Sequence, residues 1–149
     1  MKALSDNFYV AGQLEPEHFQ LAKESGISLI INNRPDGEQE GQMTAETAQK
    51  LATDLGIDYL HLPMANGQPL PNDLIPNMQT ALLQQQNKQG STLAHCRSGT
   101  RSSFLWGAIQ IIEGNCSPEE IISSANSIGI NLNGFLPVFK QIEASLEQK

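Results

Sequence analysis

Positive charge is scarce in this chain of 149 residues. Nine Lys and Arg stand against sixteen Asp and Glu, which gives a formal net charge of −7. Proteins that bind nucleic acid normally carry an excess or a patch of basic residues, so we expect no nucleic-acid partner. Cysteine is also scarce, and two Cys residues cannot hold together a disulfide-based scaffold.

Long apolar runs are lacking as well. None approaches the roughly 18 residues that a membrane span requires, and the first residues lack the apolar segment of a signal peptide. We therefore expect no membrane contact and a cytoplasmic location. Hydrophobic residues nevertheless make up 39% of the chain, enough for a real core. The length suits one domain, which we expect to span residues 1–149.

Strand-like and helix-like patterns alternate along the chain. Runs rich in apolar and β-branched residues predict strands at 27–31, 57–62 and 91–95, and a shorter apolar stretch occupies 8–12. Apolar spacing and capping residues predict helices at 16–26, 44–56, 72–90, 103–113, from 117 onward, and at 134–147. This order predicts an α/β domain with a mainly parallel central sheet flanked by helices on both faces.

The three arginines of the chain fall at one predicted edge of this sheet. In parallel sheets, binding sites form at the carboxyl ends of the strands, so the loops after residues 32, 62 and 95 should meet there. Arg34, Arg97 and Arg101 lie in two of those loops, whereas the six Lys are scattered. Because a guanidinium suits bidentate binding of an oxyanion, this edge is the candidate site.

The last of these loops carries the motif His-Cys-Arg-Ser-Gly-Thr-Arg-Ser at 95–102. Backbone N–H groups of such a loop, together with the start of the next helix, can surround an anion. The same field favours a thiolate at Cys96, which makes Cys96 the expected nucleophile. Gly99 permits a backbone conformation that a side chain would obstruct. We expect Arg101 to close the loop on the oxyanion and Ser102 to donate a hydrogen bond to the thiolate.

This motif resembles the signature of the protein tyrosine phosphatase superfamily, especially its dual-specificity-like members. The upstream order of elements is similar, with a strand at 57–62 that runs into Pro63. Together with NFYVAGQL and INNRPDGE, the motif HCRSGTRS resembles one bacterial family, the beta-lactamase-hydrolase-like, phosphatase-like domains, over about residues 6–113. The resemblance implies a dual-specificity-phosphatase-like fold and a role for His95 in orienting the loop. The residues expected to bind the substrate are Arg97, Ser98, Gly99, Thr100, Ser102, Arg34 and His95.

Two features depart from the phosphatase pattern. Four residues separate Cys96 from Arg101, where ordinary members have five, and this shorter loop is similar to that of rhodanese sulfurtransferases. The usual general acid is an Asp after the Pro of the preceding loop, but Asn66 stands there. An amide cannot protonate a leaving group. Asp36, beside Arg34, is the predicted substitute, and an equally weighted interpretation is that Asp36 is only a structural residue of the turn Pro35-Asp36-Gly37. Asp73 is the next candidate.

The sequence therefore predicts a cysteine-dependent phosphatase that hydrolyses a phosphate monoester through a phosphocysteine at Cys96. Two alternatives remain: a rhodanese-like sulfurtransferase that carries a persulfide on Cys96, and a catalytically weak oxyanion-binding module. The expected partner is a phosphorylated small molecule or a phosphoprotein, and no metal or other cofactor is expected. Cys116, just before a helix, is interpreted as an inert thiol.

Overall fold

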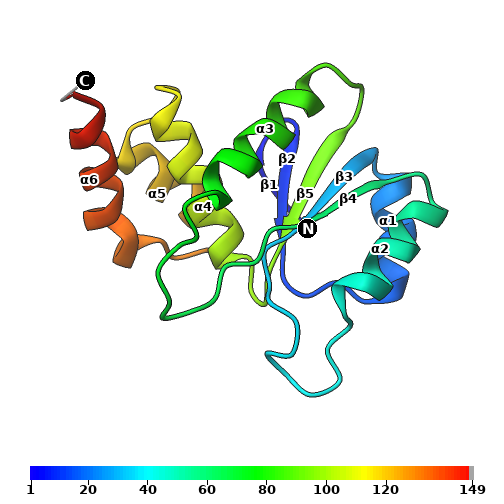
Figure 1. Ribbon diagram of the computed structural model, residues 1–149. Coiled ribbons are helices and arrows are strands. Elements are labelled where there is room, and N and C mark those ends of the chain that lie inside the picture. The colour runs from blue at the N-terminus through cyan, green and yellow to red at the C-terminus, as the bar shows by residue number, and fades with distance from the viewer. Residues whose placement is uncertain (148–149) are drawn as a thin grey trace.

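A five-stranded sheet forms the centre of the protein in the computed structural model, which describes residues 1–147 (Figure 1). The strands follow the order β1-β2-β5-β3-β4, and only β1 runs antiparallel to its neighbour. Their bounds are β1 (Lys2–Ser5), β2 (Phe8–Ala11), β3 (Ile27–Asn32), β4 (Asp58–His61) and β5 (Ser91–His95). The predicted mainly parallel sheet is confirmed.

Helices cover both faces of the sheet, as predicted. On one face, α1 (Pro16–Glu24) and α2 (Ala45–Asp54) bury Phe19 and Ala52 against Ile30 of β3. The opposite face is covered by α3 (Leu74–Gln86) and α4 (Thr100–Ile112), with α5 (Pro118–Ser127), the short 3-10 turn η1 (Asn133–Phe135) and α6 (Leu136–Glu147) packed outside α4 (Figure 1). Among residues 1–147, no helix is both long and apolar enough to cross a membrane.

Local sequence signals set most of the element boundaries. Thr44 caps α2 by accepting a hydrogen bond from the backbone N–H of Thr47, and Ser117 caps α5 through a reciprocal pair of bonds with Glu120. Strand β1 was not predicted. It is a mostly exposed edge strand without alternating apolar residues, and the turn residues Asp6 and Asn7 join it to β2.

Helix α4 begins at Thr100, three residues earlier than predicted. Gly99 precedes it with a φ of 91°, a left-handed conformation that glycine adopts without steric cost. Arg101 and Ser102 therefore belong to the first helical turn rather than to the loop. Ten of the thirteen residues of α4 are buried, so the helix is fixed against the core and its amino terminus is held at the sheet edge.

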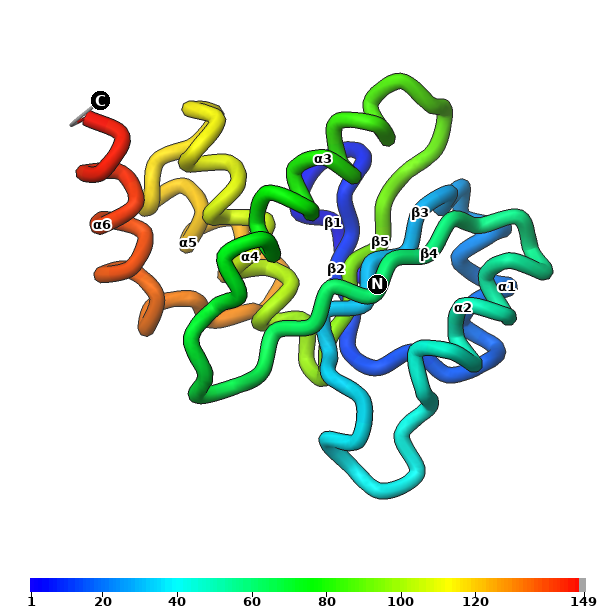
Figure 2. Tube along the Cα trace, in the orientation of Figure 1, coloured from blue at the N-terminus to red at the C-terminus, as the bar shows by residue number. Residues whose placement is uncertain are grey.

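The carboxyl ends of β3, β4 and β5 meet at one edge, as expected. Asn32, at the end of β3, pairs with His61 of β4 on one side and with His95 of β5 on the other. In Figure 2, the cyan loop after β3 and the green loop after β4 leave the sheet on the same side, next to the turn between β5 and α4.

Candidate active site

Cys96 follows the last residue of β5 and is fully buried. The backbone N–H of Gly99 donates a hydrogen bond to its Sγ at 3.1 Å. Helix α4 starts one residue later, so its amino terminus adds partial positive charge at the same place. Both features place partial positive charge beside the sulfur, the kind of surroundings in which nucleophilic thiols are found.

The connection between β2 and α1 packs against the loop that follows Cys96. A Cβ atom added to Gly12 would lie 2.8 Å from the carbonyl oxygen of Arg97, so only glycine allows the two segments to come this close. The backbone N–H of Gln13 donates to that same carbonyl oxygen at 3.3 Å. The N-terminal part of the chain thus helps to fix the shape of the 96–101 loop.

Asn33, fully buried just beyond β3, joins the three loops of the site. Its backbone N–H donates to the carbonyl oxygen of His95, and its carbonyl oxygen accepts from the N–H of Met64. Its side-chain amide donates to the carbonyl oxygen of Leu62 and accepts from the Ser102 hydroxyl. The side chain and backbone of Asn33 therefore connect the carboxyl ends of β3, β4 and β5 with the start of α4.

Arg101 points toward the loop after β3, where it meets Glu38. Its Nη1 and Nη2 donate to the two carboxylate oxygens of Glu38 at 2.8 and 2.9 Å, and Nη1 also donates to the carbonyl oxygen of Met64 at 2.7 Å. The Arg101 guanidinium holds the pKa of Glu38 below its usual value of 4.5, against the opposing effect of burial. Glu38, and to a smaller extent Cys96, in turn raise the pKa of Arg101.

Arg34 lies on the other side of the same carboxylate. Its Nε donates to Oε1 of Glu38 at 2.8 Å, and its Nη groups donate to Gln13 and Gln39. Only 2% of its side chain is exposed. The structure thus places Arg34 behind Glu38 rather than on the wall of the pocket, where a direct contact with an oxyanion was expected.

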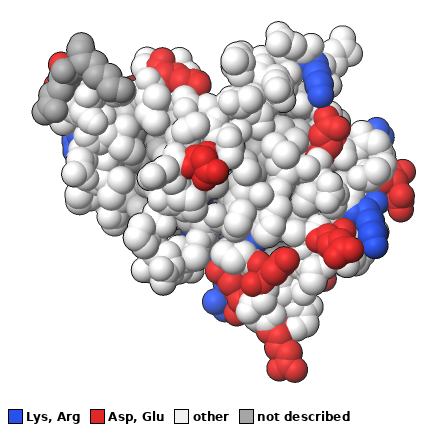
Figure 3. All heavy atoms as spheres, viewed as in Figure 1, with Lys and Arg blue, Asp and Glu red and all other residues white. Residues whose placement is uncertain are grey.

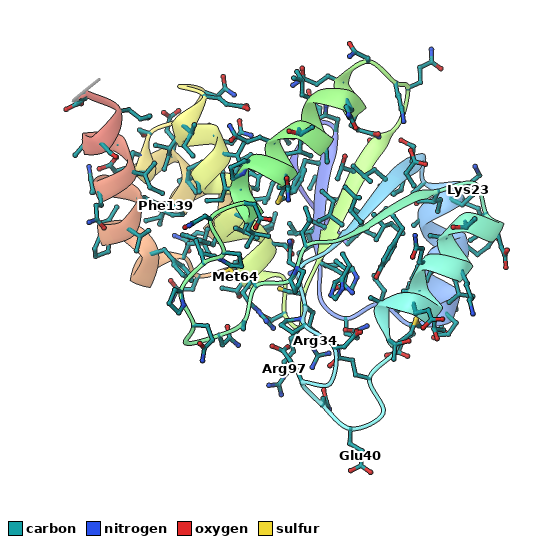
Figure 4. All side chains as sticks on the ribbon, in the orientation of Figure 1. Lys23, Arg34, Glu40, Met64, Arg97 and Phe139 are labelled. Atoms are coloured by element: carbon teal, nitrogen blue, oxygen red, sulfur yellow. The ribbon has the colours of Figure 1, made fainter. Side chains whose placement is uncertain are left out.

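A pocket of about 610 Å³ opens in front of the loop. Figure 4 shows Arg97 and Arg34 at this end of the molecule, with Glu40 farther out on the loop after β3. Of the described residues that line the pocket, none is acidic and two are arginines. The lining residues are Met64, Ala65, Asn66, Gly67, Gln68, Arg97, Ser98, Thr100, Arg101 and Phe135. The lining combines anion-binding groups with the apolar side chains of Met64 and Phe135.

His95 is buried on the strand side of the loop. Burial lowers its pKa to about 4, and the nearby charges of His61 and Arg34 act in the same direction, while the Cys96 backbone opposes the shift. Neither ring nitrogen forms a hydrogen bond of good geometry with residues 1–147. The imidazole is therefore neutral at neutral pH. The side chain is buried, and its predicted orienting role stays a prediction.

Two other predicted residues have different contacts from those expected. The Ser102 hydroxyl donates to Asn33 at 2.8 Å rather than to the thiol of Cys96. Asp36 accepts a hydrogen bond from the backbone N–H of Ala45, the first residue of α2, at 2.9 Å. Asp36 therefore occupies a helix-capping position, and its role as a general acid stays a prediction. Asp73 precedes α3 and does not line the pocket.

Glu38 and Asn33 are two polar residues of the site that sequence reasoning missed. Both lie within the stretch INNRPDGE, from which only Arg34 and Asp36 were selected. Glu38 stands 63 residues before Arg101, and nothing local in the sequence pairs them. An acidic residue four positions after a candidate arginine was the available signal. Among residues 1–147, no three His, Cys, Asp or Glu side chains form a cluster that could hold a metal ion.

The model of the beta-lactamase hydrolase-like protein, phosphatase-like domain, matches residues 1–113. The chain belongs to this family. A beta-lactamase hydrolase-like protein of Xylella fastidiosa is 29% identical over 129 residues, which cover 87% of this chain. The same alignment covers 29% of the Xylella protein, so the phosphatase-like domain described here spans less than a third of that relative.

Solved structures agree with this family assignment. A protein from Neisseria meningitidis Z2491, provisionally named a phosphatase, is 28% identical with a TM-score of 0.82, covering 95% of this chain and 96% of that one. Kinase associated phosphatase, solved with its catalytic-site cysteine replaced by serine, shares the fold at 21% identity and a TM-score of 0.69, covering 87% and 77% of the two chains. The dual-specificity-phosphatase-like fold and the family predicted from the sequence are confirmed.

Proposed function

We propose that this phosphatase-like domain hydrolyses a phosphate monoester, of a small molecule or a phosphoprotein, by the cysteine-dependent mechanism of tyrosine and dual-specificity phosphatases. One observation carries the proposal. Cys96 accepts a hydrogen bond from the backbone N–H of Gly99 just before α4, and Arg101, the second residue of that helix, lines a pocket together with Arg97, Ser98 and Thr100 of the same loop. This arrangement suits a nucleophile aimed at a tetrahedral anion.

In the first step, the Cys96 sulfur attacks phosphorus, so that an S–P bond forms while the P–O bond to the leaving group breaks. The charge of the transition state is spread over three oxygens. Backbone N–H groups of the 97–101 loop and the guanidinium of Arg101 are the donors proposed to stabilise it. Water then attacks the phosphocysteine, which releases inorganic phosphate and restores the thiol.

Arg97, Ser98 and Thr100 line the pocket and are proposed to contact the substrate. The Ser98 hydroxyl donates a hydrogen bond to the Thr100 hydroxyl at 3.1 Å, which restrains the loop where it enters α4. Arg97 is exposed, and its charge can attract a phosphorylated ligand from solvent. Acidic side chains gather at the lower end of the face in Figure 3, and the chain has a net charge of −7. A positive side chain at the pocket therefore offsets the repulsion that these acidic groups exert on a phosphorylated ligand.

The leaving oxygen needs a proton, and we retain Asp36 as the proposed general acid. Its capping bond to Ala45 must then be exchanged during catalysis. We expect Asp36→Asn to slow alkyl phosphates by about 10²-fold or more and aryl phosphates far less, because a phenolate leaves without a proton. Steady-state rates on a matched aryl and alkyl pair measure this. Equal losses on both, together with a lower melting temperature, would leave Asp36 with its capping role alone.

The four-residue spacing between Cys96 and Arg101 favours a second candidate, a sulfurtransferase that carries a persulfide on Cys96. A persulfide places its charge on one terminal sulfur and needs fewer donors than a phosphoryl group. Parallel assays separate the two functions. We expect Cys96-dependent phosphate release from an aryl phosphate, and little thiocyanate after thiosulfate and then cyanide. Rapid thiocyanate formation without phosphate release would support the sulfurtransferase instead.

A further inference from the structure

A cavity of about 490 Å³ lies at the end of the sheet opposite to Cys96. It is lined by α3, by β1, β2 and the turn between them, and by the carboxyl end of α4 (Figure 1). Phe8 and Thr92, which belong to the lining, stand near the amino ends of β2 and β5, whereas Cys96 follows the carboxyl end of β5. The volume is typical of small-molecule sites, and the mechanism above uses no residue of this cavity.

Uncharged polar side chains dominate the lining. Of its fifteen described residues, six carry amides, three carry hydroxyl groups, and Glu113 alone is charged. The amides belong to Asn7, Gln79, Gln85, Gln86, Gln110 and Asn115. Amides and hydroxyl groups both donate and accept hydrogen bonds, so they match a neutral ligand that does the same. An anion would meet no Lys, Arg or His among the described lining residues, and an apolar ligand would leave the amides unpaired.

Trp106 brings a buried and unused donor to this cavity. The residue is only 5% exposed, yet its indole N–H has no acceptor of good geometry among residues 1–147. The polar side-chain atoms that lack both a partner and contact with solvent belong to Gln42, His95 and Ser103, so the Trp106 N–H is open to the cavity that the residue lines. Because a buried indole N–H usually has a partner, this N–H is a donor that a ligand in the cavity can use.

Two amides of the lining are oriented by other residues. The side-chain nitrogen of Gln85, a mostly buried residue of α3, donates to the Ser28 hydroxyl and to the carbonyl oxygen of Ser91. The side-chain oxygen of Gln110 accepts a hydrogen bond from the Asn115 amide at 3.0 Å. Both amides keep further hydrogen-bonding capacity. A ligand that used it would have little ordering of side chains to oppose its binding.

The chemistry of these groups favours one class of ligand. Phe8 and Trp106 stack on each other with ring centroids 6.1 Å apart, and both are buried, so neither offers an open face on which a nucleobase could stack. A hydroxyl group suits the lining better, because it can donate to an amide oxygen or accept from an amide or indole N–H. We propose that this cavity is a second binding site, which takes an uncharged molecule with several hydroxyl groups, such as a monosaccharide.

Trp106 is the only tryptophan of the chain, so its fluorescence reports directly on the cavity. The probes are glucose, galactose, mannose and N-acetylglucosamine, each titrated into the wild-type chain, with adenosine as the comparison. We expect a saturable change in emission with at least one sugar and a dissociation constant of about 0.1 to 10 mM, as for a small neutral ligand held by a few hydrogen bonds. The measurement needs no turnover, so an inactive enzyme would leave this result unaffected.

Gln79→Leu removes one amide of the lining at similar side-chain volume, and Gln84→Leu is its matched control. Gln79 is half-buried and lines the cavity, whereas Gln84 lies on the same helix but lines the surface beside β4. We expect Gln79→Leu to weaken the sugar about 10-fold and Gln84→Leu to change its affinity by less than about twofold, with both melting temperatures close to that of the wild type.

Trp106→Phe removes the indole N–H and keeps an aromatic ring beside Phe8. Followed by ligand-observed NMR, it should also weaken the sugar about 10-fold. If this variant does not fold, Gln79→Leu and its control decide the question. No saturable response to any of the sugars would refute the site, and equal affinities in Gln79→Leu and the wild type would place the sugar outside this cavity. Saturation by adenosine alone would overturn the class of ligand.

Discussion

Cys96→Ser is expected to lower the turnover of an aryl phosphate by about 10⁴-fold or more. A serine hydroxyl is a much weaker nucleophile than the sulfur that accepts the Gly99 N–H hydrogen bond at the start of α4, so no comparable nucleophile remains. Steady-state phosphate release measures the loss. Binding of inorganic phosphate should persist in the variant, because Arg101 and the loop amides are unchanged.

Cys116→Ser is the matched control for this experiment. Cys116 is the other free cysteine, half-buried just before α5, and burial raises the pKa of its thiol. The pocket beside it is lined by Glu120 and Glu143 and, among the described residues, by no Lys, Arg or His side chain. We expect this variant to keep most of its activity. An equal loss in both variants would point to a redox pair and would contradict the model of a single nucleophile.

Arg101→Ala should lower kcat/KM by about 10³-fold. The change removes the only side chain of α4 that presents a fork of donors to the pocket, and single donors to a transition-state anion are worth about 10² to 10³. Arg101→Lys should recover little, because an ammonium cannot make the bidentate contact and cannot satisfy Glu38 and Met64 together.

Arg97→Ala provides the comparison for Arg101→Ala. It also removes one positive charge from the lining of the pocket. The Arg97 side chain is exposed, however, so solvent and salt weaken its attraction to a bound anion. We expect a loss of only a few-fold, carried mainly by KM and reduced at high salt. If Arg97→Ala were as damaging as Arg101→Ala, the assignment of Arg101 as the oxyanion arginine would be wrong.

The success of sequence-based prediction here depends on how far apart the interacting residues lie. Thr44 and Ser117 form their caps with residues three positions away, so both helices were predicted from local patterns. Cys96 and Arg101 are five positions apart in one loop and helix start, so their chemistry was visible too. The start of α4 at Thr100 was missed, because Gly99 was interpreted as part of a longer loop and not as the residue before the helix.

Long-range contacts could not be predicted in this way. The Glu38–Arg101 pair joins residues 63 positions apart, and Ser102 and Asn33 are separated by 69. Each of these polar side chains had several partners available in sequence, and only the parallel sheet brings them together at one edge. Asp36 and Glu38 are two residues apart on an irregular loop. No periodicity there indicates which carboxylate faces the arginine.

The central claim is that Cys96 forms a covalent bond to phosphorus during turnover. Rapid acid quenching of the enzyme with an aryl phosphate, followed by mass spectrometry of the intact chain and its peptides, tests this directly. The account predicts a transient gain of one phosphoryl group on the peptide that contains Cys96, absent in Cys96→Ser. A gain of one sulfur atom after thiosulfate, with no phosphoryl adduct at any time in a chain that releases no phosphate, would contradict it.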